Sequence, residues 1–219
     1  GTMIRIGKKA VAALVMASAL SMVFAAGKKD TTAKKSPKAA KAFVYDKTGV
    51  IKKGEAVTGD TAVISVAATS DMHGRIYSWE YAIDSAANGA GFAQTDTVVK
   101  QIKAKYPDTL LIDIGDSMQD NSSELFNDME THPMIQALNF LNYDVWVPGN
   151  HEFNFGLDFL TRNFANFEGR VVCSNIKYAD SKKPFVLPYQ IFEIDGIRVG
   201  VIGSTAPHVT TWEASAPEH

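Results

Sequence analysis

The chain has 219 residues, of which 46% are hydrophobic, and a formal net charge of −2 at pH 7. This apolar content can form a buried core and excludes an intrinsically disordered chain. Residues 61–219 carry ten basic and twenty acidic side chains, an acidic balance that excludes a nucleic-acid polymer as the expected partner. A phosphate-bearing substrate would therefore need cations held by the protein. The single cysteine, Cys173, excludes an intrachain disulfide.

Residues 1–26 are predicted to be two cloning residues, Gly1-Thr2, followed by a signal peptide. Arg5, Lys8 and Lys9 precede the apolar stretch AVAALVMASALSMVFAA, which is the order of charge and hydrophobicity typical of a secretory signal. We expect export to a periplasm or cell surface, with no stable membrane span after cleavage. A permanent membrane anchor is the alternative, and the stretch is short for a bilayer.

Residues 27–60 are rich in Lys, Thr, Ala and Gly and show neither a helical nor a strand period. This composition predicts a flexible linker. A tether to an anionic surface is the alternative interpretation. The folded domain is assigned to residues 61–219.

Within the domain, buried strands alternate with amphipathic helices. Apolar runs predict strands at 62–69, 108–116, 144–150 and 170–175, and apolar residues at helical spacing predict helices at 92–107, 132–143 and 156–167. Asp195-Gly196 between two β-rich runs predicts a hairpin. The alternation indicates an α/β domain whose central strands are mostly parallel.

Polar clusters follow three of the predicted strands: Asp71-Met72-His73, Gly115-Asp116, and Gly149-Asn150-His151-Glu152. In open α/β sheets the loops at the carboxyl ends of the strands converge on one edge. Oxygen and nitrogen donors without a thiolate suit divalent metals such as Mn, Fe(II) or Zn. Two neighbouring cations can acidify a water molecule and support phosphoryl displacement. Each cluster alone also fits an ordinary loop cap, so the prediction depends on all three meeting.

The segments DMHG, DIGD and PGNHEFNFG resemble the successive motifs of the calcineurin-like metallophosphoesterases, in particular their secreted nucleotidase branch, and the resemblance covers residues 61–210. It implies a two-sheet β-sandwich flanked by helices, with a centre of two divalent metal ions, Zn, Mn or Fe. It also implies that Asp71 and His73 bind the first metal, that Asp116 bridges both, and that Asn150 binds the second. His151 then matches the catalytic histidine, and Asn150 and His151 contact the substrate.

The expected substrate is a small nucleotide. Asn154 stands where 5′-nucleotidases typically carry an Asp that pairs with the catalytic histidine, so the chain looks closer to bacterial 2′,3′-cyclic-nucleotide 2′-phosphodiesterases with 3′-nucleotidase activity. An Asn can orient the ring of His151 but cannot carry a compensating charge. The alternatives are a 5′-nucleotidase or other phosphomonoesterase, a non-catalytic surface binding module, and a surface interaction protein tethered by the Lys-rich segment.

The resemblance also implies that further metal-binding histidine segments follow beyond His219. We therefore expect the chain to be the N-terminal part of a metallophosphoesterase domain, with a truncated sandwich and weak or no hydrolysis by itself.

Several other residues have predicted supporting roles. Asp113 is expected to orient its neighbours rather than to bind metal, and His132 is expected to cap the helix that begins at Pro133. Cys173 is expected to be an inert core residue. Trp79 and Tyr81 either frame the entrance of the site or pack in the core.

Overall fold

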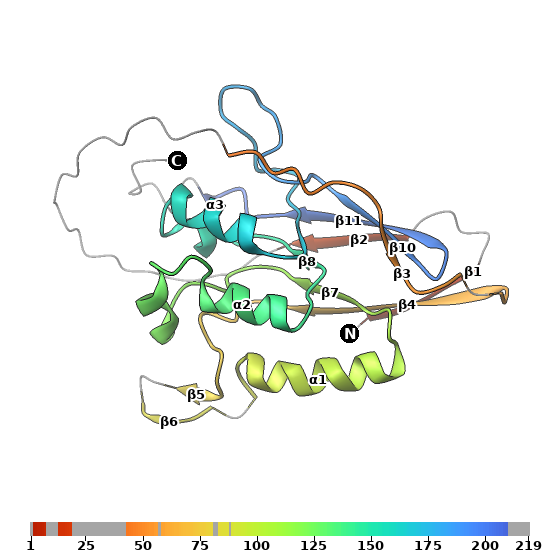
Figure 1. The fold of residues 1–219 in the computed structure, drawn as a ribbon, viewed down its shortest axis with the longest axis horizontal. Coiled ribbons are helices and arrows are strands. Elements are labelled where there is room, and N and C mark those ends of the chain that lie inside the picture. The colour runs from red at the N-terminus through yellow and green to blue at the C-terminus, as the bar shows by residue number, and fades with distance from the viewer. Residues whose placement is uncertain are drawn as a thin grey trace.

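The computed structural model describes residues 2–7, 13–18, 43–56, 58–80, 83–87 and 89–209. Within these ranges the strands form a five-stranded sheet in the order β1-β4-β7-β8-β9, a four-stranded sheet in the order β2-β11-β10-β3, and a small pair, β5-β6 (Figure 1). The predicted α/β fold with two sheets and flanking helices is confirmed. None of the helices in the described ranges is both long enough and apolar enough to cross a membrane.

Four strands of the larger sheet run parallel, as predicted. They are β4 (Thr61–Thr69), β7 (Leu110–Asp113), β8 (Val145–Trp146) and β9 (Arg170–Val171). Each connection between them contains a helix or a small pair of strands. The elements of these connections are β5 (Trp79–Glu80), β6 (Ser85–Ala86), α1 (Phe92–Lys105), the 3₁₀ helix η1 (Asn121–Phe126), α2 (Pro133–Phe140), the 3₁₀ helix η2 (His151–Phe153) and α3 (Leu157–Asn166).

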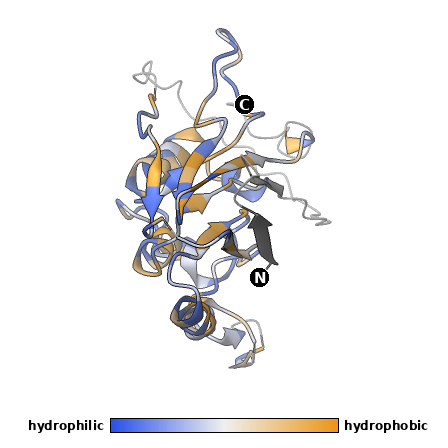
Figure 2. Cartoon of the chain, turned by 90° about the vertical axis from the view of Figure 1, so that its right-hand side faces the viewer, coloured by the Kyte–Doolittle hydropathy of each residue, from blue (hydrophilic) through white to orange (hydrophobic). Residues whose placement is uncertain are grey.

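The central strands β7 and β8 are apolar except for Asp113 at the end of β7, and both of their faces are buried. Leu110 and Ile112 belong to a hydrophobic cluster shared with the four-stranded sheet, whereas Leu111 belongs to a second cluster shared with the helices. Trp146 follows the same alternation and packs between Phe164 and other rings of the helical layer. Side chains alternate between the two faces of a strand, so a continuous apolar run is expected where both faces are covered. Figure 2 shows hydrophobic residues on the strands, while the projecting tip of the loop between β9 and β10 is hydrophilic.

The second sheet is built around the predicted hairpin. Strands β10 (Gln190–Ile194) and β11 (Ile197–Ser204) pair antiparallel and are joined by Asp195 and Gly196, whose φ angles are 52° and 78°. Two consecutive residues with positive φ are the signature of the two-residue turns that match the twist of a hairpin. The hairpin prediction is therefore confirmed.

The helices follow the predicted periods with one exception. His132 caps α2, because its ring accepts a hydrogen bond from the backbone N–H of Met134, as predicted. In α1 the buried side chains are Phe92 and Val99, whereas Val98 is 52% exposed. Val98, which belongs to the apolar helical period of residues 92–107, therefore lies on the solvent side of α1.

The N-terminal region differs from the expected linker. Strand β3 (Ile51–Lys53) pairs with β10, and the hydroxyl of Tyr45 accepts a hydrogen bond from the backbone N–H of Val171. Phe43 packs against the helical cluster. These rings contribute apolar contacts that the surrounding lysines hid in the sequence, so the part of the predicted linker from residue 43 to residue 53 belongs to the folded domain.

Two strands lie within the predicted signal peptide. Strand β1 (Thr2–Gly7) pairs antiparallel with β4, and β2 (Ala13–Ser18) pairs parallel with β11. Cleavage near residue 26 and export stay predictions. Residues 19–42 lie outside the described part of the chain.

Candidate metal centre

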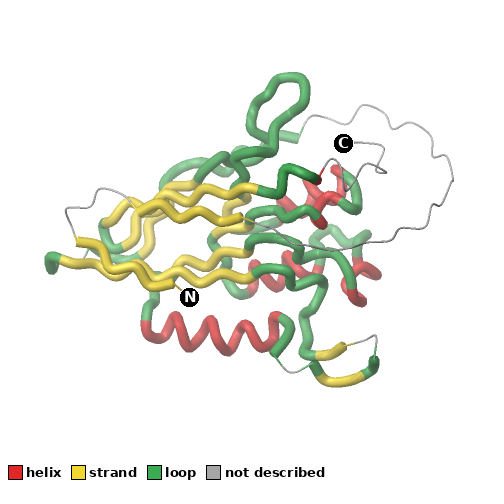
Figure 3. The backbone as a smooth tube through the Cα atoms, turned by 180° about the vertical axis from the view of Figure 1, so that it is seen from behind, coloured by secondary structure: helices red, strands yellow, loops and turns green. Residues whose placement is uncertain are grey.

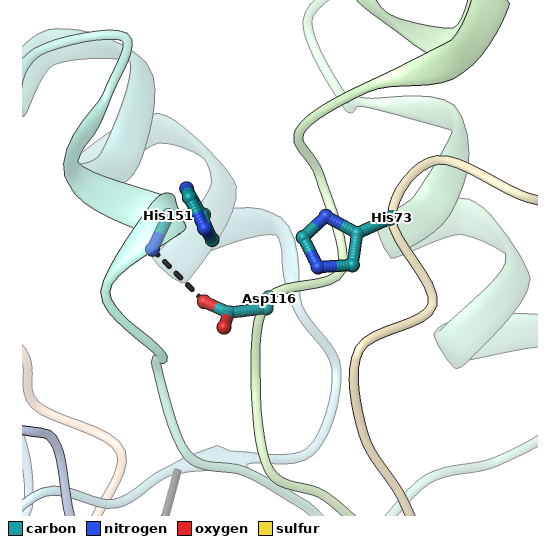
Figure 4. A group of neighbouring side chains, drawn as sticks. All are labelled: His73, Asp116 and His151. Atoms are coloured by element: carbon teal, nitrogen blue, oxygen red, sulfur yellow. Dashed lines mark hydrogen bonds between the residues drawn. The ribbon is translucent and has the colours of Figure 1, made fainter. Parts of the chain in front are cut away.

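Three loops meet at one end of the larger sheet. The loops that follow β4, β7 and β8 leave the same end of parallel strands (Figure 3). They bring together His73, Asp116 and His151, whose possible ligand atoms all lie within 4.8 Å of one another (Figure 4). The rings of His73 and His151 lie with their centroids 5.3 Å apart. Three residues that were singled out in separate segments of the sequence are therefore neighbours in space.

The other two predicted ligands lie on the same loops. One carboxylate oxygen of Asp71, Oδ1, is 4.0 Å from Nε2 of His73. Asn150 precedes His151 in the turn after β8 and is only 4% exposed. Asp71 does not belong to the group whose ligand atoms lie within 4.8 Å of one another. The metal-binding roles of all five residues remain predictions.

Backbone hydrogen bonds tie the loop after β4 to the loop after β7. The N–H groups of Asp71, His73 and Gly74 donate to the carbonyls of Gly115, Asp116 and Ser117, at 3.0, 3.0 and 2.8 Å. Asp71, His73 and Asp116 adopt φ angles of 54°, 45° and 55°. Residues other than glycine rarely adopt this left-handed backbone conformation. Several such residues close together are typical of functional sites.

Two glycines allow the loops after β7 and β8 to touch. A Cβ atom on Gly149 would lie 2.7 Å from the backbone nitrogen of Asp116, and one on Gly115 would lie 2.6 Å from Cα of Gly149. No side chain fits at either contact. The glycines beside Asp116 and Asn150 are therefore explained by close approach of backbone to backbone.

Glu152 fixes the two loops to each other, a role that the sequence did not predict. Its buried carboxylate accepts hydrogen bonds from the backbone N–H groups of Asp116 (2.8 Å), Ser117 (2.8 Å) and Gly149 (2.6 Å). Burial, followed by the nearby charge of Asp116, raises the pKa of Glu152 above its ordinary range. The only sequence signal was a carboxylate in a turn that ends a buried strand.

A second buried carboxylate, that of Asp113 at the end of β7, supports the same loops. Asp113 accepts hydrogen bonds from the hydroxyls of Thr69 (2.7 Å) and Ser117 (2.8 Å) and from the N–H of Gly115 (3.1 Å). Burial raises the pKa of Asp113 to about 6, although these hydrogen bonds lower it. The prediction that Asp113 orients its neighbours is confirmed.

The donor set fits a divalent cation. Burial also raises the pKa of Asp116, which means that the surroundings disfavour its ionised form. Asp113, Asp116 and Glu152 thus bring three carboxyl groups into a small buried volume, an arrangement that positive charge would stabilise. Oxygen and imidazole donors without sulfur suit Zn, Mn or Fe.

Two contacts orient His151. Its backbone N–H donates to Oδ1 of Asp116 at 2.9 Å, and its ring nitrogen Nδ1 lies 3.1 Å from Nδ2 of Asn154. The prediction that Asn154 orients the ring of His151 agrees with this contact. The backbone of the turn and the ring are thus positioned by different partners.

A cavity of about 630 Å³ adjoins the site on the side of Asp71 and His73. Its other lining residues include Arg75, Asp120 and Asn121. The cavity is open to solvent and lies beside the two residues expected to bind the first metal. It provides room for a small molecule next to the cluster.

Of the residues with predicted supporting roles, Cys173 is fully buried, as expected. Trp79 is 39% exposed and does not pack in the core. Tyr81 lies outside the described residues.

Comparison with known proteins gives consistent matches. Residues 64–212 match the family model for calcineurin-like phosphoesterases. The chain is 32% identical over 169 residues to the trifunctional nucleotide phosphoesterase protein YfkN of Bacillus subtilis, a match that covers 68% of this chain and 12% of that protein. The crystal structure of YfkN aligns with a TM-score of 0.63, covering 71% of this chain and 52% of that one.

Two further relatives carry more specific names. The 2′,3′-cyclic-nucleotide 2′-phosphodiesterase/3′-nucleotidase of Haemophilus influenzae is 28% identical over 165 residues, covering 68% of this chain and 25% of that protein. A snake venom 5′-nucleotidase from Naja atra is 29% identical over 150 residues, covering 65% of this chain and 28% of that protein. The matches thus span between 12% and 28% of the length of these curated relatives. The family model, the fold and the meeting of His73, Asp116 and His151 agree, and the chain belongs to the calcineurin-like phosphoesterase family.

Proposed function

We propose that the chain carries part of the metal centre of a nucleotide phosphoester hydrolase, and that its reaction is that of a 2′,3′-cyclic-nucleotide 2′-phosphodiesterase/3′-nucleotidase. The observation that carries the proposal is the placement of His73, Asp116 and His151 within 4.8 Å of one another at the ends of three strands. The name of the relative from Haemophilus influenzae supports the choice of substrate. The substrate would be a small nucleotide, and the protein would act after export to a periplasm or cell surface.

Each residue of the site has an assigned part in this proposal. Asp71 and His73 would hold the first of two divalent cations, Asp116 would bridge both, and Asn150 would contribute to the second. Bound cations would supply Lewis acidity, which neutralises phosphate charge and acidifies a water molecule. The cavity beside Asp71 and His73 would receive the nucleotide.

The chain itself would provide the proton for the leaving oxygen. With the amide of Asn154 donating to Nδ1 of His151, the proton of the neutral ring lies on Nε2. Nε2 would then donate this proton to the oxygen that leaves phosphorus. The hydrogen bond from the backbone N–H of His151 to Asp116 keeps the turn in place while the ring acts.

A 5′-nucleotidase is the second candidate, favoured by the similarity to the venom enzyme over 150 residues. Asn154 argues against it, because an amide beside His151 supplies orientation without negative charge. A non-catalytic binding module would not need Nε2 of His151 to donate a proton. The three candidate functions therefore differ in which substrate is hydrolysed and in whether hydrolysis requires His151.

The test uses the 219-residue chain in excess over substrate, so that slow single turnovers are detected. With Mn²⁺ present, 2′,3′-cyclic AMP, 3′-AMP and 5′-AMP are each followed by chromatography. We expect hydrolysis of the cyclic nucleotide and of 3′-AMP, lost in His151→Asn. Preferential hydrolysis of 5′-AMP would support the second candidate. Hydrolysis that is unchanged in His151→Asn would contradict the catalytic assignment of His151.

A further inference from the structure

Asp120 has a backbone conformation that an aspartate rarely adopts. It follows β7 in the loop before η1, with φ 72° and ψ 172°. This region of conformational space is populated almost entirely by glycine, and another residue persists there only when its surroundings compensate for the strain. The position therefore raises the question of what the aspartate side chain does that glycine would not.

The neighbouring hydrogen bonds explain the shape of the loop but not the side chain at position 120. The backbone N–H of Asp120 donates to Glu124 at 2.6 Å, and its carbonyl accepts from the hydroxyl of Ser123 at 3.0 Å. The side-chain amide of Asn121 donates to the carbonyl of His73. A glycine at position 120 would make the same backbone contacts without strain. Only the carboxylate of Asp120 remains to be explained.

That carboxylate faces the ring of His73. Its oxygen Oδ2 lies 3.1 Å from Nδ1 of His73, close enough for electrostatic attraction although the two groups are not aligned for a hydrogen bond. The other ring nitrogen, Nε2, lies on the side of Asp71. Figure 4 shows one ring nitrogen of His73 directed toward the carboxylate of Asp116. An ionised carboxylate accepts hydrogen bonds only, so it favours the ring form that carries hydrogen on Nδ1. In that neutral form, Nε2 presents its lone pair to the site.

We propose that Asp120 is a positioning residue for His73: it holds the hydrogen on Nδ1 and directs Nε2 toward the cation. This inference rests on the proposed function, because it assumes that His73 binds a cation. A carboxylate behind a histidine ligand fixes the ring and makes the ligating nitrogen more basic, and removing such a partner typically weakens metal binding by about 10- to 100-fold. The strain at Asp120 would then be retained for the cation site.

The experiment compares the parent chain with Asp120→Gly, Asp120→Asn and a control, Asp128→Asn. Glycine keeps the backbone conformation and removes the carboxylate, and asparagine tolerates positive φ and keeps the size of the side chain. Asp128 is exposed in the same loop region, so its substitution removes a charge without removing a contact to His73. Zn²⁺ affinity is measured by competition with a chromophoric chelator, and the ring form of His73 is measured by ¹⁵N NMR without metal.

Asp120→Gly should raise the melting temperature of the metal-free chain and weaken Zn²⁺ binding by about 10- to 100-fold. In both Asp120 variants the ¹⁵N shifts of His73 should change from a form with hydrogen on Nδ1 to a mixture, and Asp128→Asn should match the parent chain. Unchanged Zn²⁺ affinity and unchanged His73 shifts in Asp120→Gly would overturn the role of Asp120 and leave the proposed function intact. Failure of the parent chain to bind Zn²⁺ would overturn both.

Discussion

The hairpin turn and the loop after β7 use almost the same residues for different purposes. The hairpin places Asp195 and Gly196 at positive φ, and the site loop places Gly115 and Asp116 there. Asp195 is partly exposed and its turn satisfies the local rules for a hairpin. Asp116 is 1% exposed and is surrounded by backbone and side chains from distant segments. The buried position of the loop after β7 therefore depends on contacts with distant segments of the fold.

The difference lies in what supports the strained backbone. Strand pairing supports the hairpin, and the N–H of Asp195 also donates to the carbonyl of Lys53 at the end of β3, at 3.1 Å. The site loop depends on the carboxylates of Asp113 and Glu152, which accept four backbone N–H groups from the loops after β7 and β8. Substitutions in the site loop should therefore affect both stability and cation binding, whereas substitutions in the hairpin should affect stability alone.

Removing Glu152 is the strongest way to test this distinction. Glu152→Ala would leave three buried N–H groups without their acceptor, each at a cost of about 1 to 3 kcal/mol. We expect the free energy of unfolding, measured with urea, to fall by at least about 3 kcal/mol. The exposed Glu168→Ala serves as the control and should change it by less than about 0.5 kcal/mol. A loss below about 1 kcal/mol for Glu152→Ala would mean that water or a rearranged loop replaces the carboxylate.

The pH dependence of stability tests the burial of Asp113. Its pKa rises from 3.8 to about 6 on folding, so the folded chain binds this proton more tightly than the unfolded chain. The contribution of Asp113 to stability is therefore fully present below its unfolded pKa of 3.8. This contribution, about 3 kcal/mol, is lost as the pH rises toward and through 6. Asp113→Asn should remove that part of the dependence in urea titrations of the metal-free chain.

The matched substitution in the hairpin, Asp195→Asn, should leave most of the pH dependence in place. If Asp113→Asn and Asp195→Asn reduced the pH dependence of stability equally, the proposed difference between the two loops would be wrong.

Adding a methyl group between the loops should have an intermediate effect. The Cβ of Gly149→Ala would overlap the backbone of Asp116. Such overpacking typically costs about 1 to 3 kcal/mol, and displacement of Asp116 should also weaken Zn²⁺ binding. Gly59 has open space around its Cβ position and no positive φ, so Gly59→Ala should change neither quantity. Parent-like Zn²⁺ affinity in a folded Gly149→Ala chain would show that close contact of the loops is not required.

The same substitution in the hairpin should have the smallest effect. Gly196 has φ 78°, so Gly196→Ala places an alanine in the left-handed region at a cost of about 1 kcal/mol. The added Cβ would also lie 2.9 Å from Cβ of Ala56, which must shift slightly. Zn²⁺ affinity should remain that of the parent chain. A parallel loss of Zn²⁺ affinity would indicate that the two regions are coupled.

Local patterns were sufficient to predict the parts of the fold that depend on periodicity. The parallel strands, the helix α2 that His132 caps and Pro133 opens, and the hairpin follow from spacing and turn chemistry. The packing of residues 43–53 was not predicted, because scattered lysines hide the apolar contacts of Phe43 and Tyr45.

The candidate site shows the same division. Its three polar clusters could be located because each ends a buried strand, and their meeting follows from parallel topology. The roles of Glu152 and Asp120 could not be predicted. Their partners are backbone groups and a ring in loops distant in sequence, and no local pattern specifies such contacts.

The most direct test is the position of a bound cation. Crystals of the chain grown with Zn²⁺, with diffraction recorded at the zinc absorption edge, should show an anomalous peak about 2.0 to 2.2 Å from ligand atoms of both His73 and Asp116. Zinc found only elsewhere on the chain, with the carboxylate of Asp116 directed away from His73 and His151, would contradict the account.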